Sequence, residues 1–134
     1  MADPLFGKDW KMNSGLSVLG IGSLSPDHET RRYEEIANGY KLTVTGAHKG
    51  QPYSWGYTAI YDGQNHPVYG RDDVDSIVAY RLNEYITLGF FFKNNLEGGA
   101  YKRTTTTEGN QLTVVASGRN ARGAPYFDVI HYSS

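Results

Sequence analysis

Apolar and polar side chains alternate along much of this 134-residue chain, the pattern of β-strands with one packed and one wet face. The clearest case is the stretch 53–61, in which tyrosine, tryptophan or alanine occupies every odd position. Tyrosine hydroxyls and an indole N–H would be unsatisfied in a dry core, so this face suits the wall of a cavity. Asp62-Gly63 follows as a turn.

Nine further segments show strand patterns, and short turn sequences such as Asn38-Gly39 and Glu108-Gly109-Asn110 separate several of them. With the aromatic stretch, the predicted strands are 6–12, 30–36, 40–47, 53–61, 66–69, 75–82, 85–93, 99–106, 111–117 and 126–132. Strands of this length without helical periodicity between them indicate an all-β fold, an antiparallel up-and-down β-barrel of about nine or ten strands. We expect one domain, 1–134, in which the irregular segment 14–29 covers one barrel end as a loop, lid or short helix.

Composition narrows the partners that this barrel is expected to have. The chain carries 13 basic and 14 acidic side chains, which disfavours nucleic acid and anionic membranes as partners. It has no cysteine, and no stretch approaches the ~20 apolar residues of a membrane span. We therefore expect a soluble cytoplasmic protein without disulfides.

Several short motifs carry a resemblance in their order and spacing. They are Lys8-Asp9-Trp10-Lys11-Met12-Asn13, Tyr33-Glu34-Glu35, Trp55-Gly56-Tyr57-Thr58-Ala59 and Leu112-Thr113-Val114. Together they resemble small bacterial proteins of the lipocalin-like (calycin) kind. That resemblance implies a barrel with a cavity for a small, largely apolar molecule, in a superfamily of binders with a minority of cofactor-free enzymes. The resemblance further implies that Arg103 lies over Trp10 in a cation–π contact that closes one barrel end.

The leading functional hypothesis is that the barrel binds a small hydrophobic or aromatic molecule without a cofactor. The predicted ligand-binding side chains are mostly aromatic: Tyr33, Tyr53, Trp55, Tyr57 and Phe91. Arg103 is a further candidate for a ligand contact, as the alternative to its structural role beside Trp10.

A cofactor-independent isomerase, cyclase or lyase is the rival hypothesis. His66 and His131 share strand faces with apolar residues, so both are expected to point into the barrel, where they could act as acid or base with Tyr57. The simpler interpretation is that each histidine is hydrogen-bonded to a tyrosine hydroxyl and performs no chemistry. A third hypothesis is a filled barrel that acts through contacts with protein partners.

Other polar motifs are interpreted as structural. Metal binding is not expected, because no pair of histidines has the spacing of ligands on a strand or helix and no cysteine exists. The glycines of the segment 20–25 lack the third glycine of a nucleotide-binding fingerprint. The charged or titratable side chains expected in solvent are His28, His48, Arg31, Arg32, Arg119 and Arg122.

The strand 85–93 has large apolar groups on both faces, which a half-exposed strand should not show. The resemblance places Thr87, Gly89 and Phe91 inside the barrel. The outward set would then be Ile86, Leu88, Phe90 and Phe92. We expect this set to form a homodimer interface, unless the register is reversed and these residues are core.

Overall fold

The computed structural model describes residues 5–20, 25–106, 108–120 and 122–134. Within these residues, ten antiparallel strands form a closed barrel in which strands β2 to β10 each pair with the next along the chain. The strands are β1 Asp9–Met12, β2 His28–Ile36, β3 Gly39–His48, β4 Gln51–Ile60, β5 His66–Tyr69, β6 Ser76–Arg81, β7 Ile86–Lys93, β8 Leu96–Thr105, β9 Gln111–Arg119 and β10 Pro125–Ser133. Short β1 pairs with both β2 and β10 and closes the barrel, which confirms the predicted fold class.

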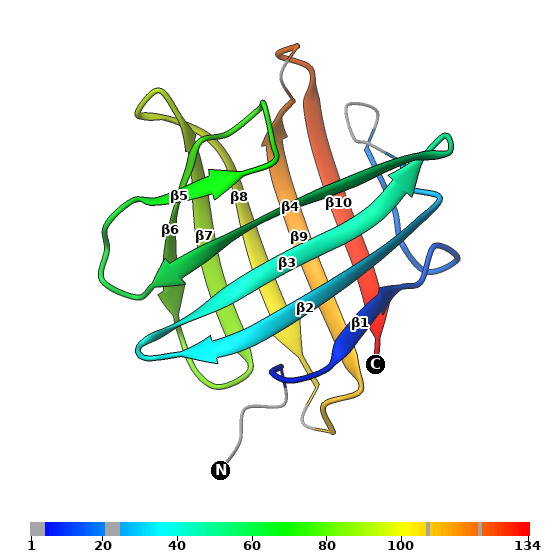
Figure 1. Ribbon diagram of the computed structural model, residues 1–134, viewed down its shortest axis with the longest axis horizontal. Helices are drawn as coiled ribbons and strands as arrows, with labels where there is room; N and C mark the ends of the chain where they lie inside the picture. The colour runs from blue at the N-terminus through cyan, green and yellow to red at the C-terminus, as the bar shows by residue number, and fades with distance from the viewer. Residues whose placement is uncertain (1–4, 21–24, 107, 121) are drawn as a thin grey trace.

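Strands β2, β3 and β4 cross in front of β6 to β10 at a steep angle, so the barrel encloses an interior between two layers (Figure 1). Tight turns make the hairpins possible. Asn94 and Asn95, between β7 and β8, have φ angles of 51° and 65°. Positive φ at both central residues is the geometry of a type I′ turn, which asparagine tolerates better than most residues.

The interior faces follow the alternation in the sequence. Tyr57 and Ala59 of β4 are buried, whereas Thr58 between them is exposed. In β7, Thr87 and Phe91 are buried inside. The register of this strand is therefore the predicted one, and its large apolar side chains at even positions face outward.

Trp10 closes one end of the barrel. Its ring is fully buried, and its Nε1 donates a hydrogen bond of 3.0 Å to the Leu5 carbonyl. The cation over this ring is Lys8 Nζ, 5.0 Å from the ring centroid. The Arg103 guanidinium instead lies 4.5 Å from the rings of both Tyr33 and Tyr40, which β2 and β3 hold opposite it. The predicted pairing of Arg103 with Trp10 is therefore wrong.

His131 lies outside the barrel, contrary to the prediction that it points inward. The buried positions of β10 are Asp128, Ile130 and Tyr132, so the alternate positions face out. Val129, whose apolar character suggested an inward face, instead forms a backbone bridge with Val18 across the outside of the strand.

Residues 13–20 run along β10 without a helix, and Leu16 and Val18 are exposed. Residues 21–24 lie outside the described part of the chain, and with them most of the glycine motif at 20–25 and part of the predicted lid. The described residues contain no helix with the length and apolar character needed to cross a membrane.

Candidate functional site

An outer cavity of about 490 Å³ lies next to an inner chamber of about 100 Å³. Leu19 and Pro26, from the segment that precedes β2, help to line the outer cavity. The side chains that line both spaces form a neck between them: Arg31, Trp55, Arg71, Tyr126, Asp128 and Ile130. Beyond the neck the wall becomes aromatic, with Tyr57, Tyr101 and Phe91 around the inner chamber.

Five predicted ligand-binding residues line these spaces. Tyr53 and Trp55 line the outer cavity, and Trp55 also belongs to the neck. Tyr33, Tyr57 and Phe91 line the inner chamber. The alternation in β4 predicted the cavity-facing positions of Tyr53, Trp55 and Tyr57, while the role of all five residues in binding stays a prediction.

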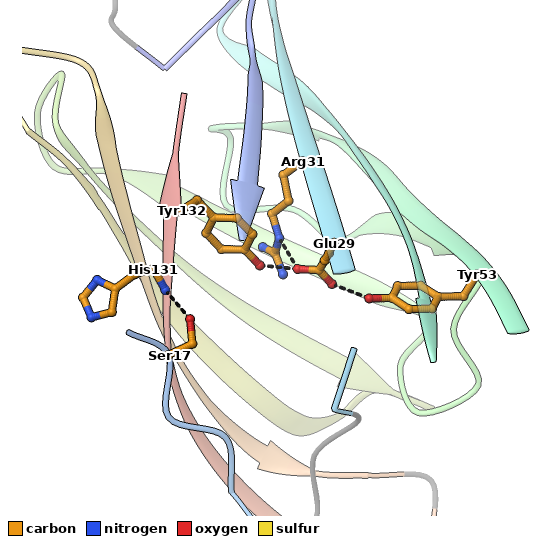
Figure 2. Close-up of polar contacts among 6 residues, drawn as sticks. All are labelled: Ser17, Glu29, Arg31, Tyr53, His131 and Tyr132. Atoms are coloured by element: carbon orange, nitrogen blue, oxygen red, sulfur yellow. Dashed lines mark hydrogen bonds and ion pairs between the residues drawn. The ribbon is translucent and has the colours of Figure 1, made fainter. Parts of the chain in front are cut away.

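Glu29 is the centre of a buried polar cluster (Figure 2), and it lines the outer cavity. Tyr53 donates a hydrogen bond of 3.0 Å to its Oε1, and the Tyr132 hydroxyl donates to its Oε2. Arg31 Nε lies 3.3 Å from the same Oε2. Burial, and then the nearby Glu29 carboxylate, raise the pKa of Tyr53, so this hydroxyl stays protonated at neutral pH.

Two arginine side chains hold Trp55 at the neck. The Arg31 and Arg71 guanidinium carbons lie 5.4 Å and 4.6 Å from the Trp55 ring. Each guanidinium also has a carboxylate partner: Glu29 for Arg31, and for Arg71 a two-bond pair with Asp73, in which Nε donates over 2.7 Å to Oδ1. Both charges are therefore compensated locally.

Gly70 allows the loop between β5 and β6 to place Arg71 on this ring. Its φ of 82° lies in the left-handed region, and a Cβ there would come within 2.9 Å of the Trp55 Cα. Any other residue would push the loop away from β4, so this glycine fixes one side of the neck.

Three tyrosine hydroxyls meet at the inner end of the chamber. Tyr40 Oη lies 2.7 Å from Tyr57 Oη and is also hydrogen-bonded to Tyr101 Oη. Tyr57 Oη donates to Tyr101 Oη over 3.3 Å. Burial raises the pKa of Tyr57 and of Tyr101 well above the ordinary value of 10.0, so these hydroxyls are donors at neutral pH.

Arg103 lies behind this hydroxyl cluster and lines neither space. It is 3% exposed, and its Nη2 donates a hydrogen bond of 2.8 Å to Thr87 Oγ1. The guanidinium therefore faces the tyrosine cluster from the closed end of the barrel.

The predicted catalytic set does not form one site. Tyr57 lines the inner chamber, whereas His66 lines neither space, and its Nε2 lies 2.9 Å from Asp62 Oδ1 at the barrel rim. The His131 ring lies on the far side of β10 from the Glu29 cluster (Figure 2), with Nδ1 3.1 Å from Thr113 Oγ1. Among the described residues, no group of three or more histidine, aspartate or glutamate side chains is arranged so that it could hold a metal ion.

Sequence reasoning missed the charged half of the neck. Arg31, expected in solvent, is 8% exposed. His48, also expected in solvent, is half-buried and lines the outer cavity. The signal for Arg31 was present, because Glu29 and Arg31 share the period-two face of buried Tyr33.

No protein-family model matches the chain, and no curated protein matches it. Among solved structures, the fatty-acid-binding protein isolated from Manduca sexta is similar over 97% of this chain and 99% of its own. The TM-score is 0.55 and the sequence identity is 16%, so the similarity concerns the fold. The chain therefore has a ten-stranded calycin-type β-barrel fold.

Proposed function

We propose that this protein binds a small aromatic or otherwise largely apolar molecule inside the barrel. The observation that carries the proposal is the outer cavity and, next to it, the aromatic inner chamber, which share Trp55 and five further lining residues. Small-molecule sites are concave, mostly apolar, and contain a few placed polar groups, which is the composition of the neck and chamber. The fold similarity to a fatty-acid-binding protein supports a ligand in the interior, and we retain the lipocalin-like bacterial family as part of the proposal.

A neutral fluorescent probe, N-phenyl-naphthylamine, tests this proposal. Its emission should rise saturably on binding, while the emission of Trp55 falls by energy transfer to the probe. Because Trp55 belongs to the neck, Trp55→Ala should weaken binding by at least about tenfold, as loss of ~1.4 kcal/mol of contact would. The affinity is measured by titrating the probe and monitoring the probe's own emission. This signal can be measured in Trp55→Ala as well, because it does not require tryptophan fluorescence.

Tyr80→Ala is the matched control, since Tyr80 is 45% exposed on the outer face of β6. It should leave the affinity unchanged, and circular dichroism should show that both variants are folded. Saturable binding that survives Trp55→Ala but is lost in Tyr80→Ala would move the site to the outer surface and end the proposal.

We further propose that the outer face of β7 forms a homodimer interface. Ile86, Leu88, Phe90 and Phe92 alternate with the buried positions and remain half-exposed. On the neighbouring strand, the Tyr80 ring packs edge to face on Phe90, which extends the apolar face across two strands. An apolar face of this kind is commonly covered by a partner in soluble proteins.

Leu88→Lys with Phe90→Lys should convert a dimer into a folded monomer, because lysines on a symmetric interface meet their own copies. Sedimentation at several concentrations measures this directly. A wild-type protein that is monomeric at high concentration would rule out the dimer, and so would an unfolded double variant, which would show that these residues are needed in the core.

A further inference from the structure

Arg103 is a buried cation without a negatively charged partner among the residues that the structure describes. Its Nη1 has no hydrogen-bond partner there, although the atom is fully buried. An isolated charge in a protein interior is costly unless it is paired or hydrogen-bonded. Arg31 and Arg71 both have carboxylate partners, so Arg103 is the exception among these three interior arginines.

The groups that face Arg103 are phenols. Tyr33 on β2, Tyr40 on β3 and Tyr57 on β4 surround it, together with Tyr101 two residues earlier on β8. Tyr61, directly after β4, is a further titratable neighbour. Neutral phenols supply donors and π-faces but no counter-charge, so the closed end of the chamber carries a surplus of positive charge and of hydrogen-bond donors.

Some of these hydrogen-bond donors face the inner chamber. Tyr57 and Tyr101 line the inner chamber, whereas Tyr40 and Arg103 lie behind them. The hydroxyl contact between Tyr57 and Tyr101, at 3.3 Å, is longer than the 2.7 Å contact between Tyr40 and Tyr57. It is therefore the weakest link of the cluster and the one that a ligand oxygen can replace.

We propose that the inner chamber binds a ring that carries an acidic hydroxyl, a phenol or an enol, and holds it as its oxyanion. The Tyr57 and Tyr101 hydroxyls donate to that oxygen, and the charge of Arg103 stabilises it through Tyr40. This inference rests on the proposed function and specifies the ligand class for the same cavity.

The binding step is balanced as a single ionisation. The O–H bond of the ligand breaks, its electron pair stays on oxygen, and the proton passes to solvent buffer through the outer cavity. Two aimed donors in a water-poor site stabilise a developing oxyanion far more than they do in water. The ligand should therefore ionise at a lower pH when bound than when free.

Two matched dyes test the inference. Para-nitrophenol turns yellow on ionisation, and para-nitroanisole has the same ring with a methyl ether in place of the acidic hydroxyl. At a pH where free para-nitrophenol is mostly neutral, the bound dye should show the phenolate spectrum, with a fall of at least about one unit in its apparent pKa, equivalent to tenfold in ionisation.

Variants then locate the source of the effect. Tyr57→Phe, Tyr101→Phe and Arg103→Gln should each lower the bound phenolate fraction by about tenfold or more while retaining affinity for para-nitroanisole, which also reports that the barrel is folded. Tyr80→Phe, on the outer face, should change neither dye.

The two dyes separate this inference from the proposed function. If para-nitroanisole binds but para-nitrophenol stays neutral in the complex, the barrel binds aromatic molecules and the oxyanion inference fails. If neither dye binds, the oxyanion inference fails, and the titration with N-phenyl-naphthylamine decides the proposed function separately. A phenolate spectrum that persists in all three cluster variants would place the dye elsewhere and also overturn the inference.

Discussion

Trp10→Ala is expected to destabilise the protein by about 3–5 kcal/mol, the range for removing a fully buried large aromatic side chain. The ring is completely buried, and its Nε1 hydrogen bond fixes the backbone at Leu5. Alanine would leave a cavity at the barrel end where short β1 closes the sheet between β2 and β10. The free energy of unfolding from urea titrations measures this effect, because a shifted midpoint with an unchanged slope reports stability.

Lys8→Met is the matched control for Trp10. It removes the cation over the ring, and the hydrogen bond from Lys8 Nζ to the Gly109 carbonyl, while keeping an unbranched side chain. The expected loss is on the order of 1 kcal/mol, because a single cation–π contact and one hydrogen bond are each modest. A loss below about 1 kcal/mol for Trp10→Ala itself would contradict the assignment of this ring as the plug of the closed end.

The barrel could be predicted from the sequence because alternation and turns are local signals. Period-two burial in β4 and β7 assigns each side chain to a face, and Asn-Gly and Asp-Gly sequences mark where hairpins turn. The same rule, continued from Tyr33 back to Arg31 and Glu29, would have found the polar cluster. Charged residues near the start of a strand are usually solvated, which is why Arg31 was expected in solvent.

His131 shows the limit of alternation. Both faces of β10 carry apolar groups, and the decisive fact is that the backbone around Val18 covers the outer face. That contact joins residues more than one hundred positions apart, so no window of sequence contains it. The placement of Arg71 is non-local in the same way, since it depends on a loop that crosses β4 at Gly70.

Arg103 was misplaced for another reason. The Trp10 pairing came from family resemblance, whereas the observed position follows from the layer in which each side chain lies. Arg103 comes two residues after Tyr101 on the same inward face of β8, and its guanidinium lies over the rings of Tyr33 and Tyr40. Lys8, two residues before Trp10 in the chain, is the cation that lies over the Trp10 ring. Sequence spacing alone does not give the relative height of strands around a barrel.

Alkaline unfolding should be steep and should begin near pH 10. Burial raises the pKa of Tyr57, Tyr101 and Tyr132 well above the value of 10.0 that tyrosine has in an unfolded chain. Below pH 10 both states hold these protons, so the stability is fully present. Above pH 10 the unfolded chain releases them and the native protein does not, so stability falls as pH rises.

The size of this effect follows from the number of phenols. Each costs about 1.4 kcal/mol per pH unit once the unfolded state is ionised, so the three together cost about 4 kcal/mol per pH unit over the interval in which the native protein keeps their protons. A domain of ordinary stability, ~5–15 kcal/mol, would unfold over or just beyond this interval. Tyrosinate absorbance should therefore rise in one cooperative step together with the loss of the near-ultraviolet circular dichroism signal.

Tyr57→Phe separates this linkage from general alkaline damage. It removes one of these buried phenols, so the loss of stability above pH 10 should shrink by about 1.4 kcal/mol per pH unit. If the three buried tyrosines instead ionise gradually near pH 10 while the dichroism signal persists, the native interior admits phenolate. An ionised tyrosine of the hydroxyl cluster would then be the counter-anion of Arg103, in place of an oxyanion brought by a ligand.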